Sequence, residues 1–462
     1  MKYPEYKNKK VLIAGLGLYK QGSGISAARF FVNQGADVTV TDLKTRTELA
    51  KSIKELKGLK IKYVLGKHRV SDFKNADIVM KNPGMRRNSK YLKAAKAAKV
   101  QIESDITIFF KHCPTKIIGI TGTRGKSTTA SLAAKILAKK KKTYLGGNIK
   151  VSPLNFLSKI KSGDFVVVEL SSWMLEDLNQ KKMSPHIALI TNVMRDHLNT
   201  YSGMKAYQEA KAMIFKHQKK DDFIILNRDN KITRGFGKRV PSQRFWFSLK
   251  DFKDENGSMA KAKRLIFRDD GRVWKVGNVK DVAMSGEHNL ANALAAIAIS
   301  KIKRVACAKV RATLRTFEGI DNRQQLIKTK GGVKYYNDTT ATTPDAGIVA
   351  LKTLSDKKNI ILIAGGADKK LLYPDWAKQV KRSCKKIILL DGSATPKMAR
   401  ELKKNKVGVE LVAKSMQEAV KTANKLAHKG DIILLSPAAA SFGLFKNEFD
   451  RGDQFVDLVK GI

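Results

Sequence analysis

The sequence has 462 residues, too many for one ordinary domain, so we expect two to four domains and take three as the central expectation. No apolar stretch reaches the roughly 18 to 20 residues that span a bilayer, and the N-terminus lacks a signal peptide, so membrane insertion is excluded and a cytoplasmic location is expected. Three scattered cysteines exclude a disulfide framework and fit a reducing compartment.

The formal net charge is +49, from 90 Lys and Arg against 41 Asp and Glu. Such a charge suits a nucleic-acid or anionic-membrane partner, or a lysine-rich surface that serves no single partner. Lysine occurs in almost every segment, and no basic arm or patch interleaved with aromatics stands out. We therefore favour the surface bias, do not expect a nucleic-acid partner, and treat a lysine at any one position as weak evidence for function.

Strands and helices alternate along the whole chain, which predicts an α/β protein with parallel sheets flanked by helices. The first α/β unit begins with the strand from Val11, which runs into Gly15 and Gly17. It continues with a helix around residues 25–34 and a strand at residues 37–41.

The second unit begins with an apolar strand that runs into Thr121-Gly-Thr-Arg-Gly-Lys-Ser-Thr128 and then a helix over residues 130–139. Strand, glycine loop and helix in this order indicate a phosphate-binding loop, because glycines let backbone N–H groups converge on phosphate and the helix start adds a favourable dipole. Ile120 replaces the first glycine of the strict motif, and a chance turn is the alternative. The residues expected to bind ATP here are Gly122, Thr123, Gly125, Lys126, Ser127 and Thr128.

Lys126 is expected to contact the β- and γ-phosphates, and Ser127 or Thr128 to ligate Mg²⁺. A phosphate-binding loop also needs an acid on a neighbouring strand to anchor the metal. The strand of residues 164–169 ends at Glu169, and a carboxylate at the end of a parallel strand faces the ligand crevice. Glu169 is therefore a candidate metal ligand, with a plain strand-end acid as the alternative.

Residues 221–285 have a different pattern of short β-rich pieces, which we interpret as extra strands added to the middle domain. The third unit has strands at residues 360–364, 386–390 and 431–435. The expected domains are therefore residues 1–104, 105–319 and 320–462.

Six motifs, in order along nearly the whole chain, resemble those of the Mur ligase family. They are the phosphate loop, Glu169-Leu-Ser-Ser172, Thr191-Asn-Val-Met-Arg-Asp-His197, Gly286-Glu-His-Asn289-Leu-Ala-Asn292, Asn337-Asp338 and Leu435-Ser-Pro-Ala-Ala-Ala-Ser441. The last motif, continued through Phe445-Lys-Asn447 to Arg451-Gly-Asp, is similar to that of the glutamate-adding members.

The resemblance implies three domains: a Rossmann-like N-terminal domain for a UDP-sugar, a central P-loop ATPase domain, and a Rossmann-like C-terminal domain for glutamate. It implies an ATP-dependent ligase that adds glutamate, the D-enantiomer being favoured, to UDP-N-acetylmuramoyl-L-alanine through an acyl phosphate. The reaction would serve peptidoglycan precursor synthesis in the cytoplasm, and the enzyme would be a monomer.

The resemblance also assigns site residues. In the family, the lysine at the place of Lys211 is carbamylated and becomes a ligand for a second Mg²⁺, which implies N6-carboxylysine here, although composition alone favours a solvated lysine. The expected catalytic residues are Lys126, Glu169, His197 and Lys211, and the expected metal ligands are Ser127, Glu169, His197 and Lys211. Further ATP contacts are expected from Asn289, Asn292, Arg323 and Asp338. Substrate contacts are expected from Gly17, Asp42, Asn82, Gly84, Asn148, Thr342, Lys369 and Ser441.

Three departures from the family pattern matter. Arg124 replaces the usual asparagine in the phosphate loop, the first glycine loop is lengthened over residues 17–24, and Thr340 stands where a lysine is usual. Because relatives that take L-glutamate look similar near Thr340, the enantiomer stays open. The rival functions are another Mur-type ligase, a nucleic-acid-dependent P-loop NTPase and, with poor glycine spacing, a nicotinamide oxidoreductase.

Overall fold

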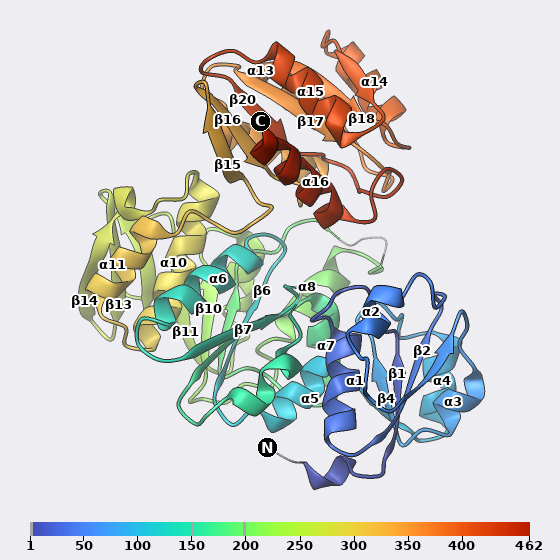
Figure 1. The fold of residues 1–462 in the computed structure, drawn as a ribbon. Helices are drawn as coiled ribbons and strands as arrows, with labels where there is room; N and C mark the ends of the chain where they lie inside the picture. Colours follow the sequence, from blue (N-terminus) through green and yellow to red (C-terminus); the bar gives the residue numbers. More distant parts are fainter. Residues whose placement is uncertain (1–2, 150, 197–199) are drawn as a thin grey trace. The chain divides into compact units, whose positions relative to one another are not determined.

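The computed structural model describes residues 3–149, 151–196 and 200–462 (Figure 1). The chain forms two compact units, one made of residues 1–283 with 287–317 and the other of residues 284–286 with 318–462. Within the described ranges, no helix is long and apolar enough to cross a membrane. The alternation of strands and helices that the sequence predicts is present over most of the described residues, but strands follow one another without a helix between them within residues 243–278 and 325–337.

The N-terminal sheet has five parallel strands among the residues described, in the order β3-β2-β1-β4-β5. Alternate residues of β1 enter two different cores, Val11 and Ile13 on one face and Leu12 and Ala14 on the other, as expected for a strand covered on both sides. The strands are β1 (Lys10–Ala14), β2 (Asp37–Asp42), β3 (Ile61–Leu65), β4 (Ile78–Lys81) and β5 (Gln101–Glu103), and the helices are α1 (Ser23–Asn33), α2 (Ala50–Lys54), α3 (Val70–Lys74) and α4 (Lys90–Ala97).

This strand order places β1 in the middle of the sheet, between β2 and β4. The chain adds β2 and β3 on one side of β1, and then β4 and β5 on the other side. Open parallel sheets bind ligands at such a switch point, outside the carboxyl ends of the strands. The loops after β1 and β4, which carry Gly17 and Asn82, start at this place. The strand order and the sequence therefore both indicate these two loops as the ligand-binding place of the N-terminal sheet.

The central sheet has nine strands in the described part of the chain, ordered β14-β13-β12-β11-β10-β9-β6-β8-β7. The β-rich pieces of residues 221–285 are strands of this sheet, and the last two pairings are antiparallel. Strand β12 could not be expected from the sequence, because Gly257-Ser-Met-Ala-Lys lacks the branched and aromatic residues typical of strands. The strands are β6 (Ile117–Thr121), β7 (Thr143–Gly147), β8 (Phe165–Glu169), β9 (Ile187–Ile190), β10 (Phe223–Asn227), β11 (Gln243–Ser248), β12 (Gly257–Lys261), β13 (Arg264–Asp269) and β14 (Arg272–Asn278).

Helix α10 is a largely buried helix of the central region. It is apolar nearly all round, with Asn292 to Ser300 continuously buried, and it packs along α6 (Figure 1). The helices are α5 (Asp105–His112), α6 (Lys126–Leu137), α7 (Ser172–Gln180), α8 (Met204–Ala212), α9 (Lys231–Phe236), α10 (Glu287–Ile302) and α11 (Cys307–Thr316).

Residues 318–462, all of which the structure describes, contain a sheet of six strands in the order β15-β16-β20-β17-β18-β19. Only the β15–β16 pairing of this fully described segment is antiparallel. Leu362 and Ile363 face two separate cores, so this sheet too is covered on both sides. The strands are β15 (Gln325–Lys330), β16 (Val333–Asn337), β17 (Ile360–Gly365), β18 (Cys384–Leu390), β19 (Leu411–Ala413) and β20 (Ile432–Leu435), and the helices are α12 (Pro344–Leu354), α13 (Pro374–Ser383), α14 (Thr395–Lys404), α15 (Met416–Leu426) and α16 (Glu448–Gly461).

Candidate functional site

The glycine loop follows β6 directly and ends at the first residue of α6. Gly122 has φ of +148° and Gly125 has φ of +79°, values that favour glycine. A Cβ at Gly122 would lie 1.8 Å from Thr191 Oγ1, and a Cβ at Gly125 would lie 2.3 Å from Asn292 Oδ1. Both glycines are therefore required by conformation and by space, as a loop that wraps phosphate with its backbone demands.

Two side chains after β9 hold this loop in shape. Asn192 Oδ1 accepts the backbone N–H of Arg124 at 2.9 Å, and the hydroxyl of Thr191 donates to the Arg124 carbonyl at 2.6 Å. Both residues belong to the motif Thr191-Asn-Val-Met-Arg-Asp-His197, but the sequence predicts no role for either of them. No sequence signal marks this role; in the structure β9 pairs with β6, so that polar residues at the end of β9 meet the loop.

The two cations of the loop point to different partners. Lys126 Nζ donates to the carbonyl of Thr123 at 3.0 Å and so folds back over the loop. Arg124 Nη1 lies 2.8 Å from Asp196 Oδ2. Ser127 and Thr128 are buried in the first turn of α6. Lys126 therefore stays over the loop itself, whereas Arg124 forms an ion pair outside the loop.

Glu169 ends β8 beside the loop, and its side chain is buried. Its Oε1 accepts a hydrogen bond from Asn148 Nδ2 at 3.0 Å, whereas its Oε2 is buried and accepts no hydrogen bond from the residues that the structure describes. A carboxylate oxygen buried in this state suits a hard cation such as Mg²⁺. The chemistry of this position therefore fits a metal ligand and disfavours a plain surface acid.

Lys211 comes from α8 and is 2% exposed. Its Nζ donates to Thr121 Oγ1 at 3.2 Å and lies 5.4 Å from the centre of the Tyr207 ring. Burial lowers the pKa of this amine well below its usual value, and the charge of Lys126 adds to the lowering while Glu169 opposes it. An amine that loses its proton easily can act as a nucleophile, which is what reaction with CO₂ requires.

His197 lies outside the described residues. Asn289 and Asn292 share one face of α10, where Asn292 Nδ2 donates to Asn289 Oδ1 at 3.3 Å. Asn292 Oδ1 also accepts the hydroxyl of Thr129, one turn into α6, at 3.2 Å. Asn292 therefore supports the glycine loop from behind, in addition to any contact with nucleotide.

Of the four residues expected to bind the UDP-sugar in the N-terminal region, Asp42 ends β2, Gly17 follows β1, and Asn82 and Gly84 follow β4. Asp42 Oδ2 accepts the backbone N–H of Leu16 at 2.8 Å and that of Gly17 at 3.5 Å. Asn82 Nδ2 donates to the Gly15 carbonyl at 3.2 Å, and its Oδ1 accepts the N–H of Gly84 at 3.0 Å. The two side chains therefore shape the first loop.

The lengthened first loop is explained by contacts with the central region. The carbonyl of Gln21 accepts the backbone N–H of Ser152 at 2.8 Å and Asn155 Nδ2 at 3.0 Å. Ser152 in turn donates to the buried carboxyl of Asp105 at 2.8 Å, and burial raises the pKa of that carboxyl. The extra residues thus attach the first loop to the segment that follows Asn148.

In the C-terminal unit, Asp338 follows β16 and is buried. It accepts hydrogen bonds from the hydroxyl of Ser436 at 2.8 Å and from the N–H of Gln324 at 3.2 Å. Burial raises the pKa of Asp338 to about 7, against the lowering influence of these bonds and of the neighbouring Arg323. The side chain of Arg323 is exposed.

The residues expected to hold glutamate also lie at the carboxyl ends of this sheet. Lys369 Nζ donates to Thr342 Oγ1 at 3.2 Å. Ser441 is buried and follows Ala440, which forms a two-way backbone bridge with Ala367. The structure therefore gathers Thr342, Lys369 and Ser441 on neighbouring loops.

Arg451, a residue that we had noted only as part of a motif, joins these loops. It is fully buried on α16, donates to Thr339 Oγ1 at 3.1 Å and to the Thr339 carbonyl at 2.9 Å, and reaches the Ala439 carbonyl at 3.4 Å. Burial lowers the pKa of Arg451 to about 10. A lone arginine in a helical segment gives no sequence signal of burial, which is why it was missed.

Three family models match the chain: the Mur ligase MurD-like N-terminal domain over residues 9–104, the Mur ligase middle domain over residues 120–300, and the Mur ligase glutamate ligase domain over residues 322–439. The chain belongs to the Mur ligase family. The three-domain α/β architecture expected for this family is confirmed.

Curated relatives in the family match this chain over nearly its full length. The UDP-N-acetylmuramoylalanine--D-glutamate ligase of Roseiflexus sp. (strain RS-1) is 41% identical over 98% of each chain. The enzyme of that name from Borreliella burgdorferi (strain ZS7) is 38% identical over 99% of each chain, and the one from Acetivibrio thermocellus is 36% identical over 99% of this chain and 97% of its own.

Solved structures of the family share the fold at lower identity. UDP-N-acetylmuramate-alanine ligase MurC from Thermotoga maritima matches with a TM-score of 0.63 and 20% identity, covering 98% of this chain and 100% of its own. MurF ligase from Thermotoga maritima, in complex with ADP, matches with a TM-score of 0.58 and 15% identity, covering 100% and 99%.

Proposed function

We propose that this Mur ligase is an ATP-dependent ligase that adds D-glutamate to UDP-N-acetylmuramoyl-L-alanine, in the cytoplasm, for peptidoglycan precursor synthesis. The observation that carries the proposal is the phosphate loop with buried Glu169 and Lys211 beside it, in a chain whose full-length relatives bear this enzyme name. Those relatives favour the D-enantiomer, which the departure at Thr340 had left open.

The reaction has two steps. The alanine carboxylate of the UDP-sugar attacks the γ-phosphorus of ATP, and the bond from that phosphorus to the β-phosphate oxygen breaks. ADP departs as the leaving group, and the carboxylate has become an acyl phosphate. The glutamate amine, after losing a proton, then attacks the acyl carbon and inorganic phosphate leaves as the amide forms. The protein's part is to position the reactants and stabilise negative charge.

Lys126 and the N–H groups of the loop would bind the ATP phosphates, since they converge at the start of α6. Ser127 and Glu169 would ligate one Mg²⁺, and carbamylated Lys211 with His197 would hold a second. Bound Mg²⁺ supplies charge neutralisation that lets the carboxylate approach the phosphate. Lys211 fits this role because it is buried, its pKa is lowered, and Glu169 is close enough to influence that pKa.

Asn148, bonded to Glu169, would meet the UDP-sugar near the reacting carboxylate. Gly17, Asp42, Asn82 and Gly84 would hold the nucleotide part of that substrate. In the C-terminal unit, Thr342, Lys369 and Ser441 would bind the two carboxylates of glutamate. The remaining proposed ATP contacts are Asn289, Asn292, Arg323 and Asp338.

The test is phosphate release from ATP in the presence of Mg²⁺ and bicarbonate, with UDP-N-acetylmuramoyl-L-alanine and either D- or L-glutamate. We expect release only when the UDP-sugar and D-glutamate are both present. Release with L-glutamate alone would correct the enantiomer. Release that ignores both substrates and responds to nucleic acid, with a steep salt dependence, would overturn the proposal.

A matched pair of variants links the activity to the loop. Lys126→Ala removes the amine that folds over the loop, whereas Lys139→Ala changes an exposed lysine just after α6. We expect the first variant to lose turnover by about 10²- to 10³-fold with its fold intact, and the second to keep it. Circular dichroism and phosphate release measure the two outcomes, and normal turnover in Lys126→Ala would exclude the loop as the ATP site.

A further inference from the structure

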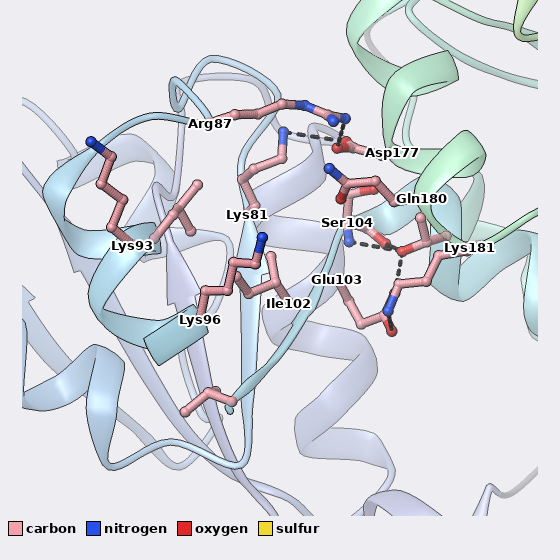
Figure 2. A pocket seen from close by; sticks show the side chains of 13 residues that line it. Lys81, Arg87, Lys93, Lys96, Ile102, Glu103, Ser104, Asp177, Gln180 and Lys181 are labelled. Atoms are coloured by element: carbon pink, nitrogen blue, oxygen red, sulfur yellow. Dashed lines mark hydrogen bonds and ion pairs between the residues drawn. The ribbon is translucent and has the colours of Figure 1, made fainter. Parts of the chain in front are cut away.

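A cavity of about 500 Å³ lies between the edge of the N-terminal sheet and helix α7 of the central region, within one compact unit (Figure 2). Its lining includes four lysines and one arginine, and Asp177 and Glu103 are the acids among the residues that line it. Each of these acids pairs with a cation from the other side of the cavity. The ion pairs therefore cross between the region that carries the first substrate loops and the region that carries the phosphate loop.

Asp177 has the more extensive set of contacts. Its Oδ2 lies 3.2 Å from Lys81 Nζ, with the two side chains 8% and 4% exposed, and its Oδ1 pairs with Arg87 Nη2. Arg87 also donates to the Trp173 carbonyl at 3.3 Å and lies 3.2 Å from Glu176 Oε2. The buried carboxylate of Asp177 thus pairs with both Lys81 and Arg87. Arg87 also contacts two other residues of α7, Trp173 and Glu176.

The two cations enclose a substrate loop. Lys81 is the last residue of β4, and Arg87 follows the Asn82-Pro-Gly84 turn. At the other end of the linkage, α7 begins at Ser172, shortly after Glu169. Asp177 is therefore the point at which the turn that faces the UDP-sugar is tied to the element that follows the metal-ligand candidate.

We propose that Asp177 is a positioning residue for the UDP-sugar: by holding Lys81 and Arg87, it fixes the Asn82-Pro-Gly84 turn relative to Glu169. The inference rests on the proposed function, since it is the UDP-sugar that the turn would bind. A substrate held at its nucleotide end must place its alanine carboxylate beside the phosphate, and a loose turn relaxes both distance and angle. Asp177 itself touches neither reactant.

Burial separates this linkage from the many lysine pairs on the surface. Exposed ion pairs contribute little because water screens them, whereas removing one partner of a buried pair leaves a charge without compensation. The second crossing pair, Glu103 with Lys181, joins the same two regions and does not involve the Asn82-Pro-Gly84 turn. It therefore provides the control for simple loosening of the interface.

The experiment compares three single variants in the full chain: Asp177→Asn, Arg87→Gln and the control Lys181→Met. We expect Asp177→Asn to raise the KM for UDP-N-acetylmuramoyl-L-alanine about tenfold and Arg87→Gln about threefold, with the KM for ATP within about twofold of the wild type. Lys181→Met should leave both KM values unchanged. Equal rises in both KM values, or the same behaviour in Lys181→Met, would overturn the proposal.

A double variant separates position from stability. Lys81→Met with Asp177→Asn removes both buried charges, so the thermal unfolding midpoint should recover towards the wild type while the KM for the UDP-sugar stays raised. If the KM recovers together with the midpoint, Asp177 is only a stabilising residue. Arg87→Gln keeps the test decisive if Asp177→Asn does not fold, because Lys81 and Asp177 remain paired in it.

Hydrogen–deuterium exchange gives a readout that does not need turnover. The amides of residues 82–89 should exchange at least about fivefold faster in Asp177→Asn and Arg87→Gln than in the wild type, and no faster in Lys181→Met. Unchanged exchange in these amides would refute the linkage even if the enzyme is active. If these amides exchange faster in the two variants, but the wild type shows no UDP-sugar-dependent phosphate release, the proposed function is refuted and the linkage stands.

Discussion

The region beside the phosphate loop and the region at the carboxyl ends of the C-terminal sheet both bury ionisable groups, and these groups differ in their hydrogen-bond partners. Asp338 in the C-terminal unit receives two hydrogen bonds from its own surroundings. Glu169 in the central region keeps one buried oxygen that accepts no hydrogen bond within the described residues, and Lys211 beside it bonds to a single hydroxyl among them.

The difference teaches where each region depends on a ligand. Buried polar groups are normally satisfied, and an exception calls for a functional reason. The Asp338 carboxyl has hydrogen-bond donors within its own unit, so it is satisfied there without a bound cation. At Glu169 and Lys211, a bound cation and a modified lysine would supply the missing partners, which is the pattern expected of groups kept for chemistry.

The largest effect that would sharpen this comparison comes from Lys211→Met. Turnover should fall by about 10³-fold because the proposed metal ligand is lost. The variant should nevertheless unfold at a higher temperature near pH 8: the folded pKa of Lys211 lies below its unfolded value, so the wild type gains stability as pH rises towards the unfolded pKa and is destabilised below it.

Lys216→Met, which changes an exposed lysine shortly after α8, is the control and should alter neither property. Phosphate release and calorimetry at pH 8 measure both. A Lys211→Met variant with lowered stability and normal turnover would show that Lys211 is a structural residue.

A smaller effect is expected from Gly125→Ala, compared with Gly271→Ala. Both glycines have φ near the same value, +79° and +76°, but only the first has Asn292 against it, and nothing lies within 4 Å of a Cβ at Gly271. The backbone strain should cost about 1 to 2 kcal/mol in each. Gly125→Ala should in addition weaken ATP binding at least about tenfold, since the loop must move away from α10.

Isothermal titration with ATP and urea unfolding distinguish the two contributions. Equal ATP affinity in the two alanine variants would mean that the loop accommodates a side chain at Gly125, and that Asn292 does not hold it in place.

The smallest effect concerns Asp338→Asn. The folded pKa of about 7 lies above the usual 3.8, so the folded wild type binds the extra proton and loses stability as pH rises from about 4 to 7, with the full loss present above 7. Asparagine has no such dependence, so the variant should match the wild type near pH 4 and melt about 5 °C higher at pH 8. A difference in melting temperature that does not change with pH would contradict the assigned pKa.

Much of the fold was predictable because it depends on local pattern. The phosphate loop, the strand ending at Glu169 and the β-rich pieces of residues 221–285 all lie within the predicted elements. Helix α6 begins at Lys126, earlier than the predicted start at residue 130, because the loop lysine is already its first helical residue.

The side-chain partners were less predictable, since they depend on contacts across the sequence. Asn192 meets Arg124 because β9 pairs with β6, and strand order is not written in either segment. Lys81 and Asp177 lie 96 residues apart in the sequence, and Arg87 pairs with the same carboxylate. Because the chain has 90 Lys and Arg, the sequence offers too many equivalent partners for Asp177 to predict this pair. The family resemblance predicted a role for Lys211, whereas its residue type alone favoured an ordinary solvated lysine.

The lysine content has a consequence at the borders of the sheets. A strand at a sheet edge exposes unpaired backbone groups that can recruit another chain and start aggregation, and a lysine on such a strand opposes this. The edge strands β3, β14 and β15 carry exposed Lys62, Lys275 and Lys330, and the edge strands β5 and β19 have only three residues each. At these five edges, though not at the five-residue edge strand β7 (Thr143–Gly147), an exposed lysine or a short length disfavours pairing with another copy of the chain.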